Sequence, residues 1–127
     1  MHIGHVGVFV QDLDKIVAFY KRYFDVKVSD AYHNEKTSFT SRFLSFDDGA
    51  KLEVCSRDDL RNVDRSGYPV GFQHIVISLG SEQDVDELTE RIEDDGYDHL
   101  DGPRVTGDGY YESVVADPEG NLIELTV

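Results

Sequence analysis

Apolar residues alternate with other residues along residues 3–10, and this two-residue period predicts a strand. Asp12 follows where a helix N-cap is expected, and the apolar residues after it have helical spacing: Leu13, Ile16, Tyr20, Tyr23 and Phe24. Three strand-like runs come next, near 26–32, 39–46 and 50–55, and a turn at 47–49 separates the last two. The first half of the chain is therefore predicted as a strand, a helix and three strands.

The second half repeats this order of elements. Residues 72–79 predict a strand, and the segment 81–84 resembles a helix capping box, with Asp where Glu or Gln is usual. Val85, Leu88 and Ile92 give the helix an apolar stripe, and Gly96 suits the position just after its end. Strands near 98–105, 110–116 and 121–127 complete this half, with a turn at 117–121 before the last strand.

Parts of the two halves also align residue by residue. Segment 5–10 (HVGVFV) aligns with 74–79 (HIVISL), and segment 48–54 (DGAKLEV) aligns with 119–125 (EGNLIEL). Few residues are identical, but the shared order of elements supports an internal repeat. We therefore predict an α+β fold of two βαβββ modules, 1–56 and 71–127. The polar, aperiodic segment 57–70 is the predicted linker between these modules, all within one domain, 1–127.

Four side chains that can bind metal recur at matching places in the two halves. His5 and His74 stand on the first predicted strand of a half, and Glu53 and Glu124 on the last. Because side chains alternate between the faces of a strand, all four oppose the aliphatic residues beside them. One such His or Glu is usually structural or solvated, but the paired recurrence favours metal ligands. Two imidazoles and two carboxylates suit Zn, Ni, Co, Mn or Fe(II), and donor type alone does not choose among these.

Charge and cysteine content narrow the class of protein. The formal net charge of −14 repels nucleic acid and anionic membranes, so we expect neither as a partner. The same charge attracts metal cations and cationic small molecules. Apolar runs are too short to span a bilayer, and the N-terminus lacks the features of a secretion signal. Cys55 is the single cysteine, which fits a reducing, cytoplasmic location.

Four motifs resemble those of the glyoxalase, or vicinal oxygen chelate, superfamily. They are G-H-V-x-V-x-V at 4–10, L-E-V at 52–54, H-I-x-I-S at 74–78 and D-P-E-G-N-x-I-E-L at 117–125. The resemblance covers residues 3–127 and implies a curved, open mixed sheet around a metal, a small-molecule substrate and a homodimer. By position, His5, Glu53, His74 and Glu124 match the four ligands of the glyoxalase I branch. This match implies one divalent metal per site. Zn or Ni is the first expectation for this metal, and Co, Mn or Fe are the alternatives.

The resemblance also implies an activity. It is that of a metal-dependent lyase or isomerase, which converts a small α-hydroxycarbonyl compound or hemithioacetal through an enediolate. Glu124 is the implied catalytic base, and Glu53 is the symmetric alternative. One departure concerns glutathione: glyoxalase I has an Arg on its first strand for this group, whereas this chain has Phe9. Two alternatives stay open: a non-catalytic binding or resistance protein that sequesters a small molecule, and a metal-dependent transferase or dioxygenase.

Overall fold

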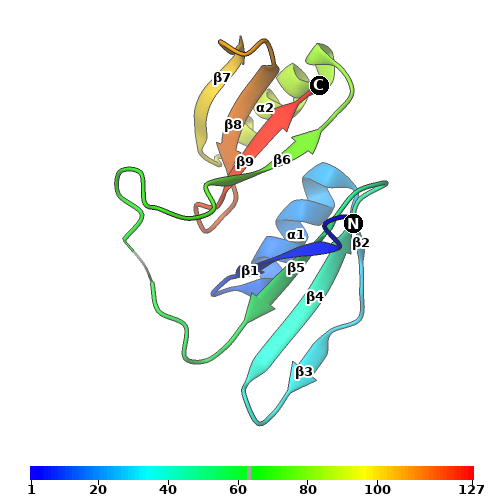
Figure 1. Cartoon of the computed structure of the whole chain (residues 1–127), viewed down its shortest axis with the longest axis vertical. Coiled ribbons are helices and arrows are strands. Elements are labelled where there is room, and N and C mark those ends of the chain that lie inside the picture. The colour runs from blue at the N-terminus through cyan, green and yellow to red at the C-terminus, as the bar shows by residue number, and fades with distance from the viewer. Residues whose placement is uncertain (63) are drawn as a thin grey trace. The chain divides into compact units, whose positions relative to one another are not determined.

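The computed structural model describes residues 1–62 and 64–127, and the chain divides into two compact units, residues 1–64 and 65–127. Unit 1 contains β1 (His5–Phe9), α1 (Leu13–Phe24), β2 (Lys27–Val28), β3 (Tyr32–Asn34), β4 (Phe39–Ser45) and β5 (Lys51–Ser56) (Figure 1). Unit 2 contains β6 (His74–Ser78), α2 (Glu82–Asp94), β7 (His99–Val105), β8 (Tyr111–Ala116) and β9 (Leu122–Thr126). The predicted linker 57–70 includes the boundary between the units, and Val63 within it lies outside the described residues.

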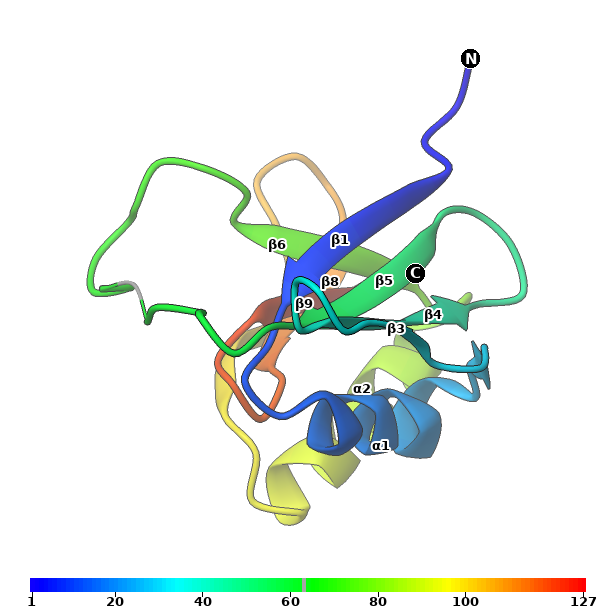
Figure 2. The ribbon, with the colours of Figure 1, turned by 90° about the horizontal axis from the view of Figure 1, so that it is seen from below.

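The sheet of unit 1 is mixed, with strand order β1-β5-β4-β2 and with β3 also paired to β4. β1 runs parallel to β5, whereas β5 and β4 are antiparallel. Asp12 caps α1, because its carboxylate accepts a hydrogen bond from the Lys15 backbone N–H at 3.0 Å. Helix α1 packs on one face of this sheet (Figure 2). Apolar residues from both layers are buried there: Ile16, Phe19, Tyr20, Leu44, Leu52 and Val54.

The predicted strand at 26–32 is two short strands, β2 and β3, rather than one. Ser29 lies between them and still bonds to β4, with its N–H donating to the Phe43 carbonyl at 2.9 Å. Its hydroxyl accepts from the Phe43 N–H and donates to the neighbouring Asp30 carbonyl. A serine that bonds its own backbone in this way competes with regular ladder pairing, which accounts for the break.

Unit 2 has a four-stranded mixed sheet with strand order β6-β9-β8-β7. Ser81 caps α2 by accepting from the Asp84 N–H, and Gly96 follows the helix with a positive φ of 87°. Buried residues join α2 to its sheet: Val85, Thr89, Ile92, Val115, Ile123 and Leu125. The predicted α+β class is thus confirmed. Unit 2 has the predicted βαβββ order, and unit 1 has the same order with its second strand divided into β2 and β3. Of the helices within the described residues, neither is long and apolar enough to cross a membrane.

Candidate functional site: two His–Glu pairs

His5 and Glu53 form a pair on the face of the first sheet that is turned away from α1. The parallel register sets Gly7 opposite Glu53, and His5 is two residues earlier on the same face of β1. The Nε2 atom of His5 lies 3.6 Å from the Oε2 atom of Glu53. The His5 side chain is 53% exposed and the Glu53 side chain 19%, so a small ion can reach both donor atoms.

His74 and Glu124 form the equivalent pair in unit 2. The register of β6 and β9 is again parallel, with Val76 opposite Glu124. The Nε2 atom of His74 lies 3.5 Å from the Oε2 atom of Glu124, and the side chains are 30% and 16% exposed. The structure therefore brings the four predicted ligands together as two pairs, each within one unit.

The spacing of each pair fits two ligands of one cation. Donor atoms bound about 2.1 Å from a shared ion lie roughly 3.0–3.5 Å apart at tetrahedral or octahedral angles. The separations of 3.5 and 3.6 Å are close to this range and longer than a usual hydrogen bond. Within residues 1–62 and 64–127, however, no group of three or more His, Cys, Asp or Glu side chains is arranged so that it could hold a metal ion. One pair alone is therefore not a complete metal centre.

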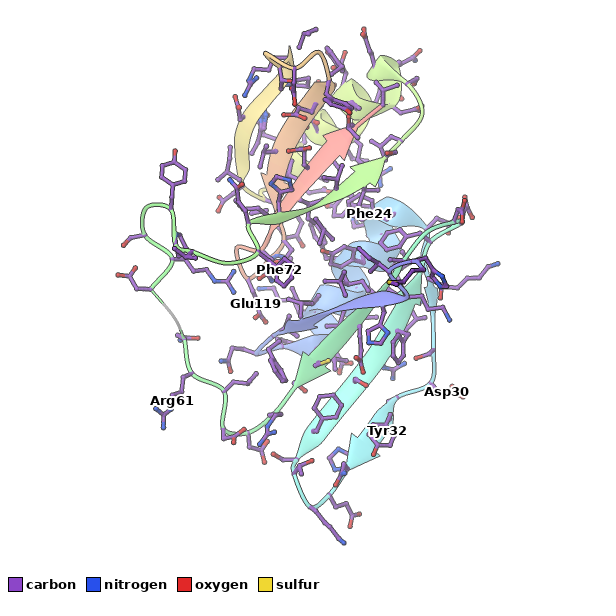
Figure 3. All side chains as sticks on the ribbon, in the orientation of Figure 1. Phe24, Asp30, Tyr32, Arg61, Phe72 and Glu119 are labelled. Atoms are coloured by element: carbon purple, nitrogen blue, oxygen red, sulfur yellow. The ribbon has the colours of Figure 1, made fainter. Side chains whose placement is uncertain are left out.

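A hydrogen-bonded turn fixes the position of Glu124. The Asp117 carboxylate accepts from the Glu119 N–H, the Asn121 N–H and the Asn121 side-chain amide, all within 2.9 Å. Figure 3 labels Glu119 at this turn. Burial raises the pKa of Asp117, and these hydrogen bonds act in the opposite direction. The turn sets the register of β8 against β9, which places Val114 directly opposite Glu124.

Phe43 adjoins the pair in unit 1 and was missed by the sequence analysis. It is the cross-strand partner of Glu53, and its ring lies edge-on to the His5 imidazole with the centroids 5.4 Å apart. The sequence did contain a signal for Phe43. The alternation along 39–46 places Phe43 on the opposite face of the strand from Leu44, which is buried.

Glu112 adjoins the pair in unit 2 and was also missed. It is hydrogen-bonded to Glu124, and burial, the Glu124 charge and this bond together raise its pKa. Two carboxyl groups share a hydrogen bond only when one of them holds a proton, which accounts for the direction. Arg104 stands opposite Glu112 on β7 and acts against the shift, while also binding Asp101 through its guanidinium group. The sequence did contain a signal for Glu112: it is an acidic residue on the face of its strand opposite to that of Ser113 and Val115, which are buried.

Cys55 is not poised for chemistry. Its side chain is buried, and burial followed by the nearby Glu53 charge raises the pKa of the thiol to about 11. The thiol is therefore protonated at neutral pH and is a weak nucleophile. Its Sγ atom lies 3.6 Å from the Glu53 carbonyl, a long contact to a backbone acceptor. Cys55 thus lies on the same face as Glu53, in the neighbouring row of the sheet between Phe9 and Ser41.

The family model described as Glyoxalase/Bleomycin resistance protein/Dioxygenase superfamily matches residues 2–125. The chain belongs to this superfamily. A lactoylglutathione lyase of Arabidopsis thaliana is 31% identical over 124 residues, which make up 95% of this chain and 42% of that protein. This chain therefore spans less than half the length of the curated relatives that it matches.

Solved structures with the same fold carry different activities in their names. The trypanothione-dependent glyoxalase I of Leishmania major is 22% identical with a TM-score of 0.78, and the alignment covers 99% of this chain and 86% of that one. A fosfomycin resistance protein of Listeria monocytogenes, complexed with Mn(II) and sulfate, is 21% identical with a TM-score of 0.71, covering 98% and 90%. Superfamily membership confirms the resemblance and the fold, whereas activity depends on the site of the individual member.

Proposed function

We propose that this glyoxalase superfamily member is a metal-dependent lyase or isomerase of a small α-hydroxycarbonyl compound or hemithioacetal. The observation that carries the proposal is the repeated pair: a His and a Glu at equivalent strand positions, 3.6 Å apart in unit 1 and 3.5 Å apart in unit 2. The 31% identity to a lactoylglutathione lyase supports this branch over the others.

In this proposal, His5, Glu53, His74 and Glu124 are the ligands of one divalent metal. Two imidazoles and two carboxylates match the donor preferences of Zn and Ni, and also of Co, Mn and Fe(II). When bound, the cation supplies Lewis-acid polarisation of two adjacent substrate oxygens. We further infer a homodimer, so that light scattering should give about twice the 14.4 kDa mass of one chain.

Glu124 is the proposed base. Its carboxylate takes a proton from the substrate carbon next to the carbonyl, which leaves an enediolate, and then returns the proton to the neighbouring carbon. The Nε2 atom of His74 lies 3.5 Å from an oxygen of this carboxylate. Glu53 occupies the equivalent position in unit 1, so its role is tested in parallel.

Metal content tests the ligand set directly. Elemental analysis of protein purified without a His tag should give about one divalent ion per chain. His5→Ala and His74→Ala should each weaken metal affinity more than the ~10–100-fold loss that follows removal of an outer hydrogen-bond partner. His99→Ala is the matched control, because His99 Nδ1 is bonded to Glu93 at 3.1 Å outside both pairs. Unchanged metal content in both ligand variants would rule out the site.

Turnover separates an enzyme from a binding protein. Metal-free protein is reloaded in turn with Zn, Ni, Co or Mn and incubated with hemithioacetals and other α-hydroxycarbonyl compounds. Isomerisation with at least one metal is the expected result. If metal binds at the four residues and no compound of this class reacts, the lyase proposal fails and sequestration of a small molecule takes its place.

A further inference from the structure

Unit 1 carries a cluster of aromatic side chains on the same sheet face as His5 and Glu53. The rings of Phe9 and Phe39 meet edge-on with their centroids 6.4 Å apart, and the Tyr32 ring lies 6.3 Å from that of Phe39. We call these three residues the aromatic wall. Tyr32, labelled in Figure 3, comes from β3, while Phe9 and Phe39 come from β1 and β4.

The strand register places the wall next to the ligand pair. Gly7, Glu53 and Phe43 form one row across β1, β5 and β4. Phe9, Cys55, Ser41 and Tyr32 form the next row on the same face. Two residues along a strand rise about 7 Å, so the wall begins about 7 Å from Glu53. Phe43, which touches the His5 ring, extends the aromatic surface to the pair itself.

The three-ring wall is not a requirement of the fold, because the four-stranded sheet of unit 2 keeps a ring at the place of Phe39, which is Tyr110, but does not repeat the other two. The place of Phe9 beside β5 is taken in unit 2 by Ser78 beside β9, and the place of Ser41 is taken by Glu112. Phe9 is nevertheless 53% exposed and Tyr32 is 57% exposed. Leaving such rings in water forgoes the favourable burial of a large apolar area. A flat apolar group lying on the wall would recover it.

We propose that Phe9, Phe39 and Tyr32 form a specificity subsite for an aryl group of the substrate, whose chelating oxygens lie at His5 and Glu53. This inference rests on the proposed function and names its substrate class: α-hydroxycarbonyl compounds that carry an aromatic ring. The spacing of about 7 Å suits a ring joined to the chelating carbon through no more than a few bonds. Offset or edge-on ring contacts supply the recognition.

Two hydroxamates test the subsite by binding alone. Benzohydroxamate and acetohydroxamate present the same pair of oxygens to a metal and differ in a phenyl against a methyl group. Calorimetry with the Ni-loaded protein should show roughly tenfold tighter binding of benzohydroxamate. Phe9→Ser, which copies the residue of unit 2, should reduce this ratio to about threefold or less. Tyr68→Ala is the control, because it removes an exposed ring that lies elsewhere in the chain and should leave the ratio unchanged.

Each other outcome is decisive. Equal affinity for the two hydroxamates, or a ratio that Phe9→Ser does not change, overturns the subsite and leaves the metal proposal standing. If light scattering shows that Phe9→Ser forms a smaller oligomer while the affinity ratio of the two hydroxamates is unchanged, the wall is a contact between copies of the chain. That outcome also overturns the subsite. If the protein binds neither metal nor hydroxamate, the metal proposal fails. The subsite is then judged by saturation-transfer NMR with benzyl alcohol, whose signal must disappear in Phe9→Ser.

Discussion

The two units of this chain place a His–Glu pair at the same point of the same strand arrangement, but the residues around the two pairs differ in kind. In unit 1 the cross-strand partner of Glu53 is Phe43, and further rings follow on the same face. In unit 2 the partner of Glu124 is Val114, and Glu112 lies beside it as a second carboxyl group. The repeated fold thus presents ligands of the same type in an aromatic setting and in an acidic one.

This difference suggests a division of labour. An aromatic surface binds flat apolar groups and contributes no base, whereas the acidic setting of unit 2 adds a second carboxyl group, Glu112, whose pKa is raised. Unit 1 is therefore the better candidate for substrate binding, and unit 2 for proton transfer. Four experiments break or sharpen this comparison, beyond the hydroxamate test.

The largest effect is expected from the two ligand carboxylates. Glu124→Gln keeps the shape and one oxygen donor of the side chain but removes its basicity. Turnover should fall by about 10²–10⁴-fold, with a much smaller loss of bound metal. If unit 1 mainly binds the substrate, Glu53→Gln should lower turnover less than Glu124→Gln does. Steady-state kinetics and elemental analysis of both variants measure this, and Glu90→Gln on the exposed face of α2 is the control. Equal losses in the two variants would refute the division.

A smaller effect is expected at Cys55. Its pKa of about 11 leaves far less thiolate at pH 8 than an ordinary thiol has. Alkylation by iodoacetamide should therefore be roughly 100-fold slower in the folded protein than in guanidinium chloride. The rate should also keep rising about tenfold per pH unit beyond pH 9, where an ordinary thiol levels off. Mass spectrometry of timed samples measures both, and a plateau near pH 9 would contradict the raised pKa.

The raised pKa of the Cys55 thiol also predicts how the stability of the fold changes at alkaline pH. Because folding raises the pKa of Cys55, the folded state prefers the protonated thiol. Its contribution to stability is complete below the pKa of the unfolded thiol, near 9, and is lost as the pH rises towards 11. Thr126, which has the equivalent place in unit 2, is buried without a titrating group and bonds to the Tyr111 carbonyl at 3.1 Å. Cys55→Ser should remove this alkaline dependence.

The smallest effect is expected at Glu112. Its raised pKa means that an ionised Glu112 destabilises the metal-free fold at neutral pH. Glu112→Gln should raise the melting temperature by a few degrees at pH 7, and the gain should vanish near pH 3, well below the ordinary carboxyl pKa of 4.5, where the carboxyl is protonated in both states. Thermal unfolding in a chelator at both pH values measures this. Glu90→Gln should show no such pH-dependent gain.

Local patterns predicted the elements of the fold well. The alternation along 3–10 and 72–79 correctly indicated β1 and β6, and the caps at Asp12 and Ser81 correctly marked the starts of α1 and α2. These features depend on residues within a few positions of one another, so the sequence contains the whole physical argument. The prediction of one strand at 26–32 was wrong, because Ser29 bonds to β4, which lies beyond the reach of any local pattern.

The sequence by itself determined which face of its strand each of His5, Glu53, His74 and Glu124 occupies, since side-chain direction follows from strand alternation. Only the tertiary structure decided what lies beside them. Strand order and register set Phe43 against His5, Glu112 against Glu124, and Tyr32 near Phe9. Those neighbours come from strands that are distant along the chain. Their meeting depends on long-range pairing, fixed by burial of the aliphatic faces under α1 and α2 and by turns such as the one at Asp117.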